Sequence, residues 1–189
     1  MRFGAGETRI HHGWGVAILA IVVWHGIDTV RHLGPDYLFS MCYLANALLA
    51  IGIIIASPPL IGVGFGWALI GLPLWTVDAW LSESVSPSSV VLHLAGVGVG
   101  ILAVRHIELP RRLVLLAIPT GLLSYVLARA FTQPCHNINA AFRVQAGWEA
   151  VFADRCLYFL VQAAAYTSVF LLLPAVTDRL RSRKAADQA

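Results

Sequence analysis

The 189-residue sequence carries little charge, since only 12% of its residues are Asp, Glu, Lys or Arg. A soluble globular domain has about twice that share, so the composition excludes an ordinary soluble domain. By contrast, 58% of the residues are hydrophobic, and they gather in long runs with few charges. A membrane-spanning helix needs about 20 such residues in succession. The sequence therefore predicts an integral membrane protein.

The apolar runs divide the chain into six blocks separated by Gly, Pro and Ser. We expect an all-α, polytopic membrane protein, a bundle of six transmembrane helices that forms a single transmembrane domain over residues 1–189. An outer loop over 133–155 and a basic C-terminal tail over 177–189 complete this scheme. The expected helices lie at about 14–33, 37–57, 60–81, 88–104, 113–132 and 156–176. The third and fourth are rich in glycine, which lets helix backbones approach closely, so we expect both inside the bundle.

The sequence lacks the marks of a cleaved signal peptide. Glu7 precedes the first apolar block, and no small-residue cleavage site follows it. The polar residues between positions 25 and 32 also do not suit the apolar region of a signal peptide. We therefore expect the first block to be a retained helix.

The net charge of +3 would also suit a nucleic-acid binder, but the distribution of basic residues favours topology as its cause. Six alternating helices place four basic residues on one side, namely Arg31, Arg129, Arg143 and Arg155. They place nine on the other, namely Arg2, Arg9, Arg105, Arg111, Arg112, Arg179, Arg181, Arg183 and Lys184. By the positive-inside rule both termini are cytoplasmic, and we expect no nucleic-acid partner.

Polar side chains interrupt the apolar runs mainly near the non-cytoplasmic ends of the expected helices. His25, Asp28 and His32 share one face of the first helix because their spacing is i, i+3, i+7. The other members of this set are Cys42 and Asn46, Asp78, His93, and the loop residues His136, Asn137 and Asn139. Ionisable residues within a membrane usually face a cavity and mark a site. We expect these residues to line a polar pocket that opens outward.

Several chemistries suit this set of residues. Cys42 and His93 are expected at similar depth, so the thiol has a base available, although a buried cysteine also serves as an inert packing residue. His25 and Asp28 suit zinc when a third ligand comes from another helix, and histidines of two helices also suit a b-type haem. Cys135 and Cys156 bracket the outer loop, and whether they form a disulfide stays open.

Three sequence stretches resemble a known family. They are SMCYLANALLA in the second block, VVLHLAGVGVGILA in the fourth and HNINAAF before the sixth. In this layout they resemble the YwaF-like bacterial integral membrane proteins, which belong with the six-helix membrane acyl hydrolases and acyltransferases of the androgen-induced-gene type. The resemblance implies that Cys42 stands at the nucleophile position and His93 at the histidine position. Asn137 and Asn139 match an asparagine-containing stretch near the last helix.

The leading hypothesis is an enzyme of the plasma (inner) membrane of a bacterium, an acyl-ester hydrolase or acyltransferase that acts on a lipid in the outer leaflet. Cys42 would be the nucleophile and His93 the general base, while Asn46, Asn137 or Asn139 would stabilise the oxyanion. No cofactor is expected, and the partners are membrane lipid and an acyl-ester substrate. The alternatives are a metal-dependent hydrolase built on His25 and Asp28, and a non-catalytic binding protein or transporter.

Overall fold

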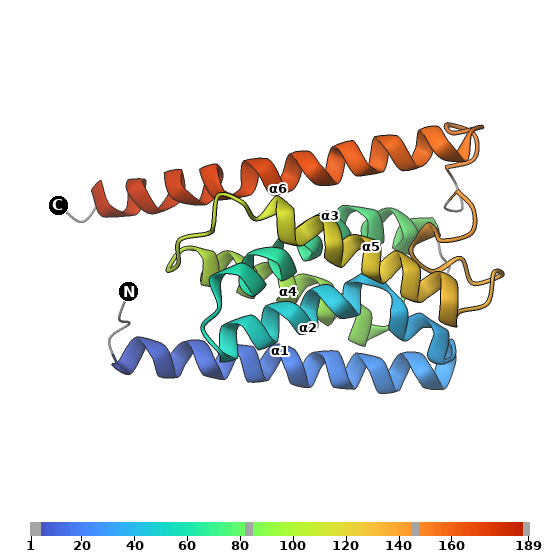
Figure 1. Cartoon of the computed structure of the whole chain (residues 1–189). Helices are drawn as coiled ribbons and strands as arrows, with labels where there is room; N and C mark the ends of the chain where they lie inside the picture. Colours follow the sequence, from blue (N-terminus) through green and yellow to red (C-terminus); the bar gives the residue numbers. More distant parts are fainter. Residues whose placement is uncertain (1–4, 82–84, 145–147, 187–189) are drawn as a thin grey trace.

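The computed structural model describes residues 5–81, 85–144 and 148–186, and these residues are helical with short connections (Figure 1). They form six α-helices and two short 3-10 helices and contain no strand. In chain order these are α1 (Ala5–His32), η1 (Pro35–Phe39), α2 (Met41–Ile54), α3 (Pro58–Leu81), α4 (Pro87–Val104), α5 (Val114–Phe131), η2 (Ile138–Ala140) and α6 (Arg155–Ala186). The expected all-α fold is confirmed.

Five of these helices are long and apolar enough to cross a membrane, namely α1, α3, α4, α5 and α6. The exception is α2, whose 14 residues extend only about 21 Å, less than the roughly 30 Å of a bilayer core. The sequence predicted one helix over 37–57, but the chain forms the separate turn η1 before Ser40. Ser40 is extended at φ −67° and ψ 146°, and it is the N-cap of α2. At the other end Ala56 has φ 52°, and Pro58 then begins α3.

The helices alternate in direction, so that the described start of α1 and the described end of α6 lie at one end of the bundle (Figure 1). We call the opposite end, where η1 and η2 lie, the loop end. The sixth helix also continues ten residues past the expected limit at 176, through most of the predicted basic tail. Residues 187–189 of that tail and Arg2, which counted toward the predicted topology, lie outside the described residues.

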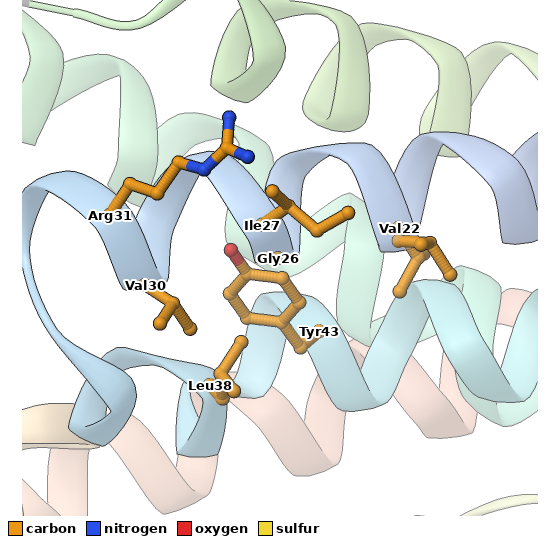
Figure 2. Close-up of a pocket in the computed structure, with 8 residues that line it drawn as sticks. Val22, Gly26, Ile27, Val30, Arg31, Leu38 and Tyr43 are labelled. Atoms are coloured by element: carbon orange, nitrogen blue, oxygen red, sulfur yellow. The ribbon is translucent and has the colours of Figure 1, made fainter.

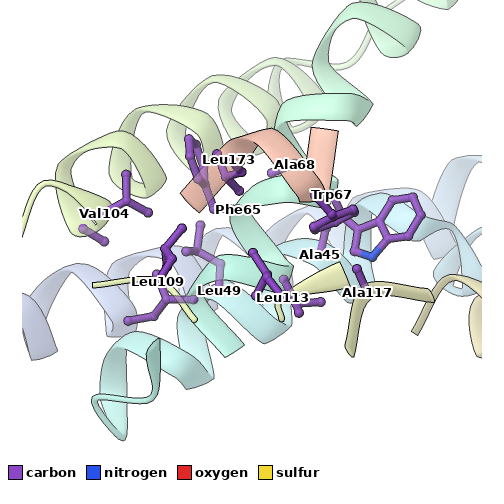
Figure 3. Close-up of a cluster of buried hydrophobic side chains, with 14 of the residues drawn as sticks. Ala45, Leu49, Phe65, Trp67, Ala68, Val104, Leu109, Leu113, Ala117 and Leu173 are labelled. Carbon is purple, nitrogen blue, oxygen red and sulfur yellow. The ribbon is translucent and has the colours of Figure 1, made fainter. Parts of the chain in front are cut away.

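The bundle core forms mainly around α3, and α3 and α4 are the most buried of the five long helices. Within their most apolar windows 44% of residues are buried, compared with 17–22% for α1, α5 and α6. The core side chains include Leu49 of α2, Phe65 and Trp67 of α3, Val104 of α4 and Leu173 of α6 (Figure 3). The predicted interior position of the two glycine-rich helices is therefore confirmed.

Glycine permits the closest approach between α2 and α3. A Cβ atom added at Gly64 would lie 2.4 Å from the backbone nitrogen of Leu49 and 2.7 Å from the carbonyl oxygen of Ala45. No side chain fits there without moving one helix away from the other. This contact fixes α2 against α3, and α2 carries the candidate nucleophile Cys42.

Candidate functional site

Polar side chains from α1, α2, α3 and α4 gather near the loop end of the bundle. They form two neighbouring clusters, which meet at the first turns of α4. The thiol cluster contains Cys42, Asn46, Trp75, Ser89 and His93. The carboxylate cluster contains His25, Asp28, Thr29, Tyr43, Ser86 and Ser88. Residues that lie far apart in sequence are thus brought together by the helix packing.

The thiol cluster is built around a contact between Cys42 of α2 and His93 of α4. The Sγ atom of Cys42 lies 3.1 Å from Nε2 of His93, which is within hydrogen-bonding distance. His93 is buried and Cys42 is partly buried. This is the arrangement of a nucleophile with an adjacent base.

The other nitrogen of His93 determines which atom of the neutral ring carries the proton. Nδ1 lies 2.8 Å from the backbone carbonyl oxygen of Ser89. A carbonyl can only accept, so Nδ1 is the donor and Nε2 keeps a lone pair directed at the Cys42 thiol. In the neutral state His93 is therefore set up to accept the thiol proton.

Trp75 of α3 fixes the plane of the His93 ring. The two rings stack with centroids 4.5 Å apart and an interplanar angle of 13°. The indole Nε1–H of Trp75 donates a 2.9 Å hydrogen bond to the hydroxyl of Ser89. The same serine therefore orients His93 through its carbonyl and is bonded to Trp75 through its side chain.

Cys42 lies in the first turn of α2, two residues after the N-cap Ser40. The positive end of a helix dipole favours negative charge on a group in this position, including a thiolate. Asn46, one turn further, donates from Nδ2 to the carbonyl of Cys42 at 2.9 Å. Its Oδ1 is buried with no hydrogen-bond partner among the described residues, and it lies 2.0 Å from where a Cβ of Gly96 would stand. Asn46 thus packs α2 closely against α4.

The carboxylate cluster is centred on the buried hydroxyl of Ser88. This hydroxyl donates to Oδ2 of Asp28 and lies 2.9 Å from Nδ1 of His25, from which it accepts. The His25 ring stacks on Tyr43, with centroids 5.0 Å apart. The Tyr43 hydroxyl donates to the carbonyl of His25 at 3.1 Å and is also hydrogen-bonded to the hydroxyl of Thr29. These contacts join α1, α2 and α4.

The side chains of the predicted metal alternative are engaged in hydrogen bonds within the protein. His25 and Asp28 both bond to Ser88, while His32 is exposed and turns back to Asp28, with Nδ1 3.2 Å from Oδ1. Among the described residues no group of three His, Cys, Asp or Glu side chains could hold a metal ion. The donor geometry therefore does not single out a metal-binding position here.

The asparagines of the outer loop bond to backbone groups around them. Oδ1 of Asn139 accepts from the N–H of Met41 at 2.7 Å, and its Nδ2 donates to the Phe39 carbonyl and to the Ser124 hydroxyl at 2.8 Å each. Oδ1 of Asn137 accepts from two N–H groups of its own loop. Both residues have φ near +50°, a conformation that asparagine tolerates. Asn139 therefore holds the loop against η1, α2 and α5, whereas Asn137 stabilises the loop internally.

His136 joins the same loop to η1 through Asp36. Its Nδ1 lies 2.9 Å from Oδ2 of Asp36, and the N–H of Gln133 donates to that oxygen at 2.8 Å. The backbone hydrogen bond from Gln133, followed by that from His136, lowers the pKa of the Asp36 carboxyl below its usual value. The remaining candidate, Asp78 near the end of α3, is exposed and lies within electrostatic reach of Cys42. Cys135 and Cys156 are exposed, and each has a free thiol.

An open groove on the outer surface of α1 differs from the polar pocket that the sequence predicted. Val22, Ile27 and Val30 form its apolar wall, and the ring of Tyr43 lies at its centre (Figure 2). His25 and Asp28 do not line it. The side chains of the two polar clusters are buried or partly buried.

Sequence reasoning missed Ser88, Ser89 and Trp75 as members of these clusters. A usable signal existed, because Ser89 precedes His93 by four residues and therefore shares its helical face. The sequence predicted Ser88 and Ser89 only as the first residues of the helix over 88–104. The link from Trp75 depends on how α3 packs against α4, which spacing along the sequence does not reveal.

Comparison with protein-family models, with curated proteins and with solved structures finds no match to this chain. The contacts described above are therefore the basis for assigning a function.

Proposed function

We propose that the protein is a membrane-embedded acyl hydrolase or acyltransferase that uses Cys42 as nucleophile and His93 as general base. The 3.1 Å contact between Cys42 Sγ and His93 Nε2 is the observation that carries this proposal. The support is specific to this pair. Because Nδ1 of His93 donates to the Ser89 carbonyl, Nε2, which faces the thiol, is the nitrogen that can accept a proton.

In the first half-reaction the thiol proton passes to Nε2 of His93, and the sulfur attacks the carbonyl carbon of a lipid ester. The tetrahedral intermediate collapses, the ester C–O bond breaks, and the imidazolium returns the proton to the departing alkoxide. The acyl group remains on Cys42 as a thioester. The amides of Asn46, Asn137 and Asn139 already donate to backbone carbonyls, so in this proposal the positive end of α2 stabilises the oxyanion.

The second half-reaction regenerates the thiol. His93 takes a proton from water or from an acceptor alcohol, whose oxygen attacks the thioester carbonyl. The C–S bond breaks, and the proton on Nε2 passes to the departing sulfur. Water gives a free acid, and an alcohol gives a new ester, so the acceptor decides between hydrolase and acyltransferase.

The proposal places the reaction in a membrane. The five spanning-length helices support membrane insertion, and α2 together with η1 would complete a six-helix bundle. With both termini cytoplasmic, as the distribution of arginines predicts, the loop end faces outward. Cys42 would then lie at the depth of ester groups in the outer leaflet of a bacterial plasma membrane.

Labelling with a thiol-reactive acyl probe tests the assignment in detergent-purified protein. The wild type is expected to react at Cys42, and His93→Gln is expected to slow this reaction by about 10²-fold or more, because the general base is lost. Cys135→Ser and Cys156→Ser are the matched controls, since both thiols are exposed, whereas Cys42 is partly buried against His93. If the probe labels Cys42→Ala to the same extent as the wild type, the proposal is contradicted.

A further inference from the structure

The groove on α1 combines an apolar wall with one unpaired cation. Ile27 and Val30 of α1 and Leu38 of η1 are each more than 40% exposed, so they present open apolar surface. Arg31, in the last turn of α1, lines the same groove (Figure 2). No carboxylate or carbonyl of the described residues pairs with its guanidinium.

The length of the groove matches one leaflet of a bilayer. From Val22 to Arg31 α1 rises about 14 Å, which is close to half of the roughly 30 Å hydrocarbon core. Arg31 lies at the loop end of this stretch, where the spanning segment His12–His32 finishes. The apolar part therefore lies at the depth of an acyl chain, and the cation lies at the depth of headgroups.

The floor of the groove is shaped to leave room for a chain. Gly26 provides no side chain, and a Cβ added there would meet Leu38 at 3.5 Å and Tyr43 at 3.8 Å, which are ordinary contacts. The Tyr43 hydroxyl is bonded inward to His25 and Thr29, so its ring rather than its hydroxyl is available to the groove. A larger side chain at position 26 would occupy the space without displacing a helix.

We propose that this groove binds one phosphate-bearing membrane lipid, with an acyl chain along α1 and the phosphate on Arg31. Charge complementarity supports the headgroup position, since an arginine binds phosphate through paired, charge-assisted hydrogen bonds. The apolar wall and its depth support the chain position. The site is separate from Cys42, and binding there requires no turnover.

Native mass spectrometry with added phosphatidylglycerol, or with diacylglycerol of the same chains, tests the proposal. Phosphatidylglycerol is expected to bind about tenfold more tightly, a difference that Arg31→Gln abolishes through loss of the phosphate contact. Arg105→Gln is the matched control, because Arg105 is also exposed but lies outside the groove. Equal binding by the Arg31 and Arg105 variants would overturn the phosphate assignment.

A second pair of variants tests the chain position. Gly26→Leu is expected to weaken binding of both lipids about tenfold, whereas Gly13→Leu on the same helix is expected to leave it unchanged, since a Cβ at Gly13 meets nothing within 4 Å. Unchanged binding in Gly26→Leu would overturn the proposal. A protein dimer that Gly26→Leu dissociates would also overturn it, because a second copy of the chain would then occupy the groove. Cys42 labelling is measured in parallel, so a failure here is distinguishable from a failure of the proposed chemistry.

Discussion

His93 is held by three different contacts, and each sets a separate property of the ring. The Ser89 carbonyl fixes the tautomer, Trp75 fixes the plane, and Cys42 faces the remaining nitrogen. Catalytic histidines need such orientation because proton transfer depends on geometry as much as on basicity. Trp75 is thus a positioning residue in the proposed reaction.

Substitution of Trp75 tests this role. Trp75→Phe keeps an aromatic ring but removes the hydrogen bond to Ser89, so we expect Cys42 labelling to slow by about two- to tenfold. Trp75→Ala also removes the stacking and is expected to slow it further. Trp80→Phe and Trp80→Ala are matched controls, since Trp80 is 86% exposed. Labelling at the wild-type rate in both Trp75 variants would contradict the positioning role.

At the residue scale the sequence predicted that Cys42 and His93 lie near each other, and it did so for a clear reason. Cys42 and His93 could be matched because helix direction and distance from a helix end give depth in a membrane. The same reasoning could not distinguish which polar side chains bond to one another. Ser88, for example, lies between His25 and Asp28 only because α1 and α4 pack at that point.

At the element scale the position of α2 depends on small residues. Gly64→Ala would place a methyl group against the backbone of Leu49 and Ala45, so α2 and α3 must separate. We expect a loss of about 1–3 kcal/mol of stability, seen as a lower thermal midpoint in detergent. Gly98→Ala in α4 meets nothing within 4 Å and serves as the control. Its midpoint should be unchanged or slightly higher, because alanine favours helix. Equal midpoints for the two variants would refute this close contact.

The outer loop is attached to η1 through Asp36, which makes its docking sensitive to acid. The hydrogen bonds from Gln133 and His136 lower the pKa of the folded carboxyl, so the folded state binds its proton less readily than the unfolded state. The stabilisation is therefore complete above the ordinary carboxyl value near pH 4 and is lost as the pH falls through the lowered value. Thermal midpoints of wild type and Asp36→Asn should differ at about pH 5 and converge below about pH 4. A constant difference down to pH 2 would contradict this assignment.

The element boundaries show what hydrophobic runs can and cannot predict. The ends of α4 and α5 were predicted within one residue, because Pro87 and Glu108-Leu109-Pro110 interrupt the apolar pattern. The start of α2 was not predicted, since Tyr37 to Phe39 are apolar enough to continue a helix. Their separation as η1 depends on tertiary contacts, among them the hydrogen bonds of Asn139 to Phe39 and Met41.

At the scale of the whole molecule the bundle is chemically asymmetric. At the end of the bundle opposite the loop end, the helices pack through apolar core residues such as Leu113 and Val104. The loop end holds the thiol and carboxylate clusters. Composition and periodicity predicted this asymmetry, because polar residues cluster near alternate helix ends. The proposed chemistry and the proposed lipid site both lie toward the loop end.

The most direct test of the central claim is mass spectrometry of an acyl intermediate on Cys42. After brief incubation with a lipid ester and rapid acid quenching, a peptide containing Cys42 should carry the acyl group as a hydroxylamine-sensitive thioester. The adduct should be absent from Cys42→Ala, and it should form about 10²-fold more slowly in His93→Gln. Ester turnover with no acyl group on Cys42, or at an undiminished rate in Cys42→Ala, would contradict the account.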